Sequence, residues 1–317
     1  MSAVAEQPRP PAARHQPPPA RPSLLKRLIG SEHLAGWMFV APAVILIAIF
    51  FLIPIGWSLI LSLQANNLLG SHHYVGFANY NALSKDHVFR SAVGHTVLYT
   101  VIFVPISVIG ALGLAVALNR RIRGIRFYRL AVFTPLVTST VATGILFLWL
   151  LDPTFGLVNY VLHAVGLPQQ QFLQSPSEAL YCIVAMTVWG WLGFDVIVYL
   201  AALQGIPEEL MEAAEMDGAS RFSRFRTIVL PLLSPATLFL VVWSTINALQ
   251  LFDEIYVTTR GGPLESTTVI VYYLYQQAFQ YFNAGYGSAI AYVLFIGILI
   301  ITLVQMWVGR RRVYYTS

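Results

Sequence analysis

The sequence has little charge. Only 10% of its 317 residues are Asp, Glu, Lys or Arg, against about a quarter in an ordinary soluble domain. It has one cysteine, Cys182, and two lysines, whereas 57% of its residues are hydrophobic. This composition excludes a soluble globular domain, a disordered chain, a collagen and a disulfide scaffold. It predicts an integral membrane protein.

Long uncharged runs define the predicted spans. Residues 36–63 continue for 28 residues without a charge, enough to cross a bilayer of roughly 30 Å. Six windows have the required length: residues 36–63, 93–118, 130–151, 179–203, 232–252 and 284–308. The run at 267–279 is short for a span, so we expect an interfacial or re-entrant helix there. The predicted fold is all-α and polytopic, with a membrane domain over 31–312.

The two ends of the chain are predicted to be tails. Residues 1–23 contain seven prolines and almost no large apolar side chain, so we expect a disordered segment over 1–30. A short tail follows at 313–317. Sixteen of the 19 Lys and Arg residues fall in the N-terminal tail, the loops at 119–129 and 204–231, and the C-terminus. By the positive-inside bias both termini are cytoplasmic.

The loop at 204–231 is too structured for a linker. Pro207 suits the first turn of a helix, Glu208 and Glu209 suit its positive end, and Asp217-Gly218 suits its stop. Ser220 is a capping residue for a second, amphipathic helix that ends near Pro231. From the pattern alone the loop is either a rigid docking element or a segment lying on lipid headgroups.

One motif in this loop resembles a known family. Glu212-Ala213-Ala214, then Gly218, then Ile228, Leu230 and Pro231 resembles at every defining position the EAA motif of permease subunits in bacterial ATP-binding-cassette (ABC) importers. The resemblance implies the type I importer fold, with Glu212, Ala213, Ala214, Asp217 and Gly218 docking in a cleft of the ATPase subunit. Ile228, Leu230 and Pro231 would brace the loop against the membrane domain.

Two further segments resemble the carbohydrate-uptake branch, the maltose-type and glycerol-phosphate-type permeases. They are Phe252–Val257, running on to Gly261-Gly262-Pro263, and Trp191–Phe194. The resemblance covers about residues 36–312 and departs from the family at Arg260. It implies a second permease subunit as heterodimer partner, two cytoplasmic ABC ATPases and an extracytoplasmic solute-binding protein. It also implies a location in the bacterial cytoplasmic (inner) membrane.

The chain has no recognisable energy source of its own. Its two lysines, Lys26 and Lys85, lie outside any Gly-rich phosphate loop, so ATP and Mg are expected in the partner ATPase and no cofactor in this chain. An ion-coupled carrier or channel would need several ligands near mid-membrane, and Asp195 is the only carboxylate in a predicted span. An intramembrane enzyme would need a catalytic pair that the sequence does not offer.

Asp195 is the first candidate for the solute path. An aspartate at the centre of a span costs about 2.5–3.5 kcal/mol on insertion scales, so it should face the bundle interior. It either pairs with Ser, Thr or Tyr of another span or faces the path. Its neighbour Trp191 offers an aromatic ring that could stack on a sugar or simply pack.

The fifth predicted span carries a polar face. Ser244, Asn247 and Gln250 recur every three residues, and Asp253 extends the series. These groups serve either a path or interhelical hydrogen bonds. The match to the maltose-type permease implies solute contacts at Leu192, Gly193, Val196, Ser244, Asn247, Ala248 and Gln250.

The lack of positively charged residues in the predicted spans favours a neutral solute. No predicted span contains Lys or Arg, so a phosphate ester would find no cation there. We therefore expect a sugar or polyol, with a glycerol-phosphate-type solute as the alternative within the branch. The positive charge is dispersed, which argues against nucleic acid. His95 and Cys182 have no neighbours at ligand spacing, so neither a metal site nor a catalytic residue is expected.

Overall fold

The computed structural model describes residues 32–67, 70, 72–120 and 123–310. The predicted tails at 1–30 and 313–317 lie outside this range. The chain divides into two compact units, residues 1–57 and 58–317. The first unit holds α2 (Glu32–Ile47), a short π-helix η1 (Ala48–Leu52) and the start of α3 (Ile53–Ser62). Together Gly36–Ser62 form the most apolar candidate span, as the sequence predicts.

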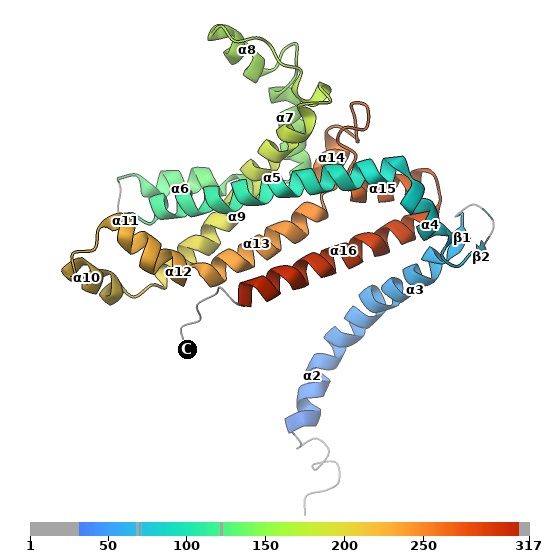
Figure 1. Cartoon of the computed structure of the whole chain (residues 1–317), viewed down its shortest axis with the longest axis horizontal. Helices are drawn as coiled ribbons and strands as arrows, with labels where there is room; N and C mark the ends of the chain where they lie inside the picture. Colours follow the sequence, from blue (N-terminus) through green and yellow to red (C-terminus); the bar gives the residue numbers. More distant parts are fainter. Residues whose placement is uncertain (1–31, 68–69, 71, 121–122, 311–317) are drawn as a thin grey trace, which may run out of the picture. The chain divides into compact units, whose positions relative to one another are not determined.

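Three long helices form the core of the second unit (Figure 1). They are α5 (His87–Leu118), α9 (Ala179–Gln204) and α13 (Ser234–Leu249), and each packs against the other two. Small residues at the contacts, such as the fully buried Ala111 and Ala115 of α5, let the backbones approach closely. A fourth long helix, α16 (Ala284–Arg310), packs against α13.

The third predicted span is not one straight helix. The chain forms α6 (Ile125–Phe133), a 3₁₀ turn η2 (Pro135–Val137) and α7 (Thr140–Leu150), bent by 105° at the break. Pro135 lacks an N–H and cannot continue the hydrogen-bond ladder of α6. The described residues therefore hold five candidate spans, or six if the bent pair is one span. The six-span expectation thus depends on counting the bent pair once.

Short elements connect the long helices. They include a two-stranded antiparallel hairpin, which an all-α expectation omits, with Gln64 paired to Tyr74. The run at 267–279, which was predicted as an interfacial or re-entrant helix, contains α15 followed by a short π-helix. These elements are β1 (Gln64–Asn66), β2 (His72–Tyr74), α4 (Ala78–Lys85), α8 (Leu157–Ala164), η3 (Phe172–Gln174), α14 (Asp253–Val257), α15 (Ile270–Tyr275) and η5 (Gln276–Gln280).

Asp86 joins α5, α15 and α16 through hydrogen bonds. Its carboxylate caps α5 by accepting the N–H groups of Val88 and Phe89, and it accepts the hydroxyls of Tyr273 at 2.6 Å and Tyr286 at 2.5 Å. Burial raises the pKa of Asp86, but the four hydrogen bonds outweigh it and hold the pKa below its usual value. The ionised carboxylate is therefore part of the folded structure.

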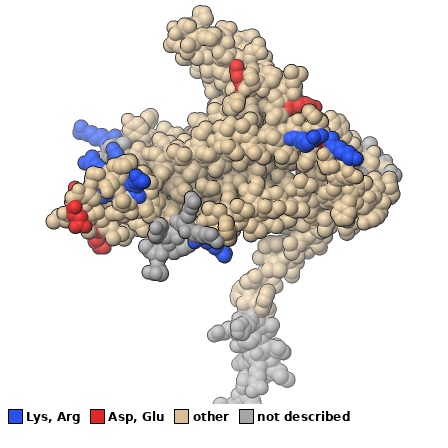
Figure 2. Space-filling model, viewed as in Figure 1, with Lys and Arg blue, Asp and Glu red and all other residues tan. Residues whose placement is uncertain are grey.

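Charged side chains gather at the ends of the helix bundle. In Figure 2 most of them lie around α10 and α11 at one end and at the opposite end, with a largely uncharged surface between; a red group also lies on the arm that carries α7, and a blue group at the lower edge. The apolar side chains of α5 and α16 that are exposed in this surface suit contact with lipid or another apolar partner. The distribution fits a membrane protein whose polar ends lie outside the hydrocarbon.

Candidate functional site

The cytoplasmic loop predicted at 204–231 folds into short helices in a compact turn. It contains α10 (Glu208–Met216), α11 (Arg221–Arg224), a short π-helix η4 (Phe225–Val229) and α12 (Leu230–Leu232). Pro207 is the residue before α10 and not its first turn, with Glu208 and Glu209 following it. The predicted stop is confirmed, because α10 ends before Asp217.

Gly218 shapes the turn between α10 and α11. Its φ of +77° is left-handed, a conformation that glycine adopts without a Cβ penalty. Its N–H donates to the carbonyl of Glu215, and the N–H of Ala219 donates to Ala214. Ser220 caps α11 by accepting the N–H of Ser223 at 3.2 Å, as predicted. The local signals in the sequence thus set this turn.

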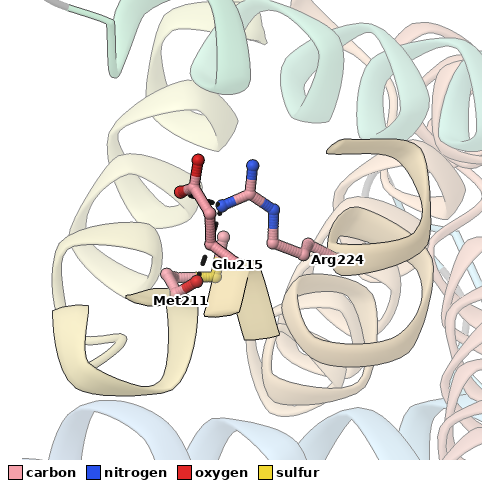
Figure 3. Close-up of polar contacts among 3 residues, drawn as sticks. All are labelled: Met211, Glu215 and Arg224. Atoms are coloured by element: carbon pink, nitrogen blue, oxygen red, sulfur yellow. Dashed lines mark hydrogen bonds and ion pairs between the residues drawn. The ribbon is translucent and has the colours of Figure 1, made fainter. Parts of the chain in front are cut away.

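Arg224 holds the two helices of the loop together (Figure 3). Its guanidinium donates to the carboxylate of Glu215 at 2.7 Å and to the carbonyl of Met211 at 3.5 Å. The side chain of Arg224 is only 13% exposed, whereas that of Glu215 is 69% exposed. The sequence assigns this arginine to the polar face of an amphipathic helix; the structure instead turns it back onto α10.

The predicted docking residues are mostly accessible. Glu212, Ala213, Asp217 and Gly218 are exposed, Ala214 is half-buried, and α10 has no buried residue. The predicted bracing residues Ile228, Leu230 and Pro231 are half-buried.

Two neighbours of the predicted bracing residues, Val229 and Leu233, are buried in the core. Phe222, in contrast, is 72% exposed, so the predicted apolar face of the second helix divides between the core and the surface. The end of η4 and the residue after α12 thus anchor the loop in the core, whereas α10 has no buried residue and lies at the surface.

A cavity lies among the three central helices. Its volume is about 170 Å³. Seven of the predicted path residues line it: Trp191, Asp195, Ser244, Asn247, Ala248, Gln250 and Asp253. The polar face predicted along the fifth span therefore faces a single space. α9 contributes one wall and α13 the other, with α5 behind them.

Asp195 makes the predicted pairing with another span, and its role in a solute path stays a prediction. It is 3% exposed and accepts the hydroxyl of Ser107 from α5 at 2.5 Å, which is the pairing with another span. It also lines the cavity. The hydroxyl of Tyr199, one turn along α9, donates instead to Thr237 at 3.1 Å. A carboxylate has acceptor capacity beyond one hydroxyl, so Asp195 can take a further donor from the cavity.

Three predicted path residues lie outside the cavity lining. Val196 is fully buried in the core, and Leu192 packs against the same core. A Cβ at Gly193 would lie 2.7 Å from the carbonyl oxygen of Val132 on α6, so this glycine permits the close approach of α6 and α9. In this structure the three residues make helix contacts, and their role in the path stays a prediction.

Glu254 is the residue that sequence reasoning missed. We expected Asp195 to be the only carboxylate within a span, but the candidate span Ser234–Val257 also contains Asp253 and Glu254. Glu254 is 8% exposed and lines the cavity. The chain leaves helical geometry after Leu249 and resumes it in α14, so the apolar count from α13 stops too early. The apolar residues Ile255, Tyr256 and Val257, just beyond Glu254, are the sequence signal that could have extended it.

The charge of the cavity is of one sign. Its lining includes Asp195, Asp253 and Glu254 and no Lys or Arg. Aromatic side chains complete it, including Tyr99, Phe103, Trp191 and Trp243. Carboxylates accept hydrogen bonds from hydroxyls, and aromatic faces contact apolar ring faces. Chemically, the arrangement can bind a neutral molecule with many hydroxyl groups.

The remaining titratable groups form no metal site in the described part of the chain. No group of three His, Cys, Asp or Glu residues there could hold an ion. A ring nitrogen of His95 lies 3.0 Å from the carbonyl of Thr268, consistent with a structural histidine. Cys182 packs partly buried against the core.

Comparisons with known proteins agree with this geometry. A family model described as "Binding-protein-dependent transport system inner membrane component" matches residues 109–314. The lactose transport system permease protein LacF of Rhizobium radiobacter is 38% identical over 285 residues, which cover 87% of this chain and 94% of LacF. The sn-glycerol-3-phosphate transport system permease protein UgpA of Agrobacterium fabrum is 34% identical, over 92% and 100% of the two chains.

A solved structure is also similar. It is a bacterial alginate ABC transporter in complex with an alginate pentasaccharide-bound periplasmic protein, in which one chain matches with a TM-score of 0.81 and 26% identity. The match covers 90% of this chain and 97% of that one.

Proposed function

The chain belongs to the inner membrane components of binding-protein-dependent transport systems, and from this we propose that it forms part of an uptake path for a neutral sugar or polyol. It is a transport subunit and not an enzyme, with the fold of a type I ABC importer permease. The observation that supports a neutral solute is the cavity lined by carboxylates, amides, hydroxyls and aromatic rings but by no cation.

The assembly that we propose has four further subunits. A second permease completes the path, two ABC ATPases bind ATP and Mg on the cytoplasmic side, and a solute-binding protein delivers the solute from outside. Both termini of this chain face the cytoplasm. The exposed face of α10, with Glu212, Ala213, Ala214 and Gly218, docks on an ATPase.

The mechanism is alternating access around the cavity. Closure of the ATPase dimer moves α10, and the segment from α11 to α12 joins α10 to the start of α13. Since α13 carries Ser244, Asn247 and Gln250, its movement would change access to the solute. Hydrolysis then resets the path inward.

The solute class is tested by uptake into proteoliposomes that contain the complete importer. The probes are radiolabelled lactose, maltose, glucose and glycerol, with sn-glycerol 3-phosphate as the anionic comparator because a relative is named for it. We expect ATP-dependent uptake of a neutral probe. Uptake of the phosphate ester should be at least about tenfold slower, because the charged groups that line the cavity are all carboxylates and would repel it. Uptake of the phosphate ester alone would contradict the proposal.

A further inference from the structure

The cavity described above has a neighbour. A second chamber of about 200 Å³ lies on the other side of Trp191, between the bend of the third span and α9. Thr140, Thr187, Trp191 and Glu254 line both chambers. None of the path residues predicted from the sequence, apart from Trp191, belongs to the second chamber. The two chambers therefore meet along a shared wall that includes a buried carboxylate.

The broken helix contributes polar side chains to the second chamber. Thr138 and Ser139 form the break between η2 and α7 and are exposed to the chamber side of the bend. Ser139 precedes α7 without capping it by its side chain, so the first N–H groups of α7 have no side-chain partner from Ser139. Irregular backbone at membrane depth is tolerated only where it is buried in protein or lines a water-filled cavity. The break thus suits a hydrated chamber.

Glu254 needs hydrogen-bond donors from the chambers. No Lys or Arg lines either chamber, and burying a carboxylate without partners is costly. Trp191 lines both chambers beside Glu254, and a carboxylate can accept more hydrogen bonds than one indole N–H supplies. Hydroxyl groups are neutral donors that suit this position.

We propose that the second chamber is a second solute subsite and that Glu254 accepts hydroxyl groups of a neutral sugar that extends across both chambers. One unit of the sugar lies beside Asp195 and Asn247, and the next lies against the break before α7. Trp191 stands between them, where its ring contacts the apolar face of either unit. The inference rests on the proposed uptake of a neutral sugar and adds where its second unit is held.

One substitution fills the second chamber alone, and another tests the carboxylate that the two chambers share. Gly190 lines only the second chamber, and a Cβ there has no atom within 4 Å, so Gly190→Leu fills the chamber without displacing backbone. Glu254→Gln keeps the shape of the side chain and removes its charge. The matched control is Gly113→Leu in α5, where a Cβ also meets nothing within 4 Å and which lines neither chamber.

The experiment measures ATP-dependent uptake of radiolabelled lactose, maltose, glucose and galactose by the complete importer in proteoliposomes. We expect Gly190→Leu to slow disaccharide uptake at least about tenfold, and Glu254→Gln to do so by a similar factor, because a hydrogen bond to a charged group is lost. Gly113→Leu should stay within about twofold of wild type. Assembly of each complex is checked by gel filtration, and Ser139→Phe replaces Gly190→Leu if that variant does not assemble.

The outcomes distinguish this inference from the proposed function. If wild type imports disaccharides and neither Gly190→Leu nor Glu254→Gln slows them, the second subsite is wrong while sugar uptake stands. Import of monosaccharides alone would also overturn the subsite. If wild type imports none of the four sugars and no glycerol, the proposed solute class fails, and the second subsite fails with it.

Discussion

The loop at 204–231 and the lining of the cavity were both predicted from the sequence, with different success. In the loop, the stop of α10 before Asp217 and the cap at Ser220 lie where the residues predict them. In the cavity, the bend of the third span and the burial of Glu254 were missed. Loop signals act within a few residues, whereas the cavity depends on which helices meet. The comparison teaches that residue patterns predict the local turns of the loop better than the lining of the cavity.

The largest effect should come from breaking the local signal in the loop. Gly218→Pro forces φ near −65° where the structure has +77° and removes the N–H that bonds Glu215. We expect solute-stimulated ATP hydrolysis by the complete importer to fall at least about tenfold, because α10 is reoriented. Gly218→Asn, which tolerates the left-handed region, should keep most of the activity. Equal activity of the proline variant would show that the turn does not matter.

On the cavity side, two glycines of α9 offer the sharpest contrast. Gly193→Leu places atoms against the carbonyl of Val132, whereas a Cβ at Gly190 has open space. We expect Gly193→Leu to destabilise the chain by about 1–3 kcal/mol, the usual cost of overpacking. The measurement is thermal unfolding of the purified chain in detergent, with Gly190→Ala as the control. Equal unfolding temperatures would mean that α6 and α9 are not closely packed at this point.

Asp86 tests whether long-range polar contacts matter outside the cavity. Its folded-state pKa is lowered, so its contribution to stability is present above the unfolded pKa and is lost as the pH falls through the folded pKa. Asp86→Asn should unfold several degrees below wild type at pH 6, and the difference should shrink toward pH 3. The check is a series of thermal unfolding curves across this range. A difference that does not change with pH would contradict the assignment.

The smallest effect is expected at the ion pair of the loop. Arg224→Ala loses the bonds to Glu215 and to the carbonyl of Met211, and a covered side-chain stem, whereas Glu215→Ala loses one partly exposed contact. A double-mutant cycle on thermal unfolding should give a coupling energy of about 0.2–1 kcal/mol. The exposed Arg226→Ala is the matched control. Equal effects of Arg224→Ala and Arg226→Ala would remove the special role of Arg224.

The extent of sequence-based prediction follows from these contrasts. The apolar runs predicted the long spans because bilayer thickness fixes their length, and the three-residue spacing of Ser244, Asn247 and Gln250 placed them on one cavity wall. Pro135 was visible, yet its position alone does not say that the span bends by 105°. Ser107 as the partner of Asp195 required knowing that α5 packs on α9.

The central claim is that this chain forms a path and draws its energy from a separate ATPase. The most direct measurement is sugar uptake into proteoliposomes by the complete importer, compared with the same complex carrying a hydrolysis-deficient ATPase and with this chain alone. We predict accumulation only in the first case, and its loss when Glu212→Ala weakens docking. Accumulation by the chain alone, or undiminished accumulation with the inactive ATPase, would contradict the account.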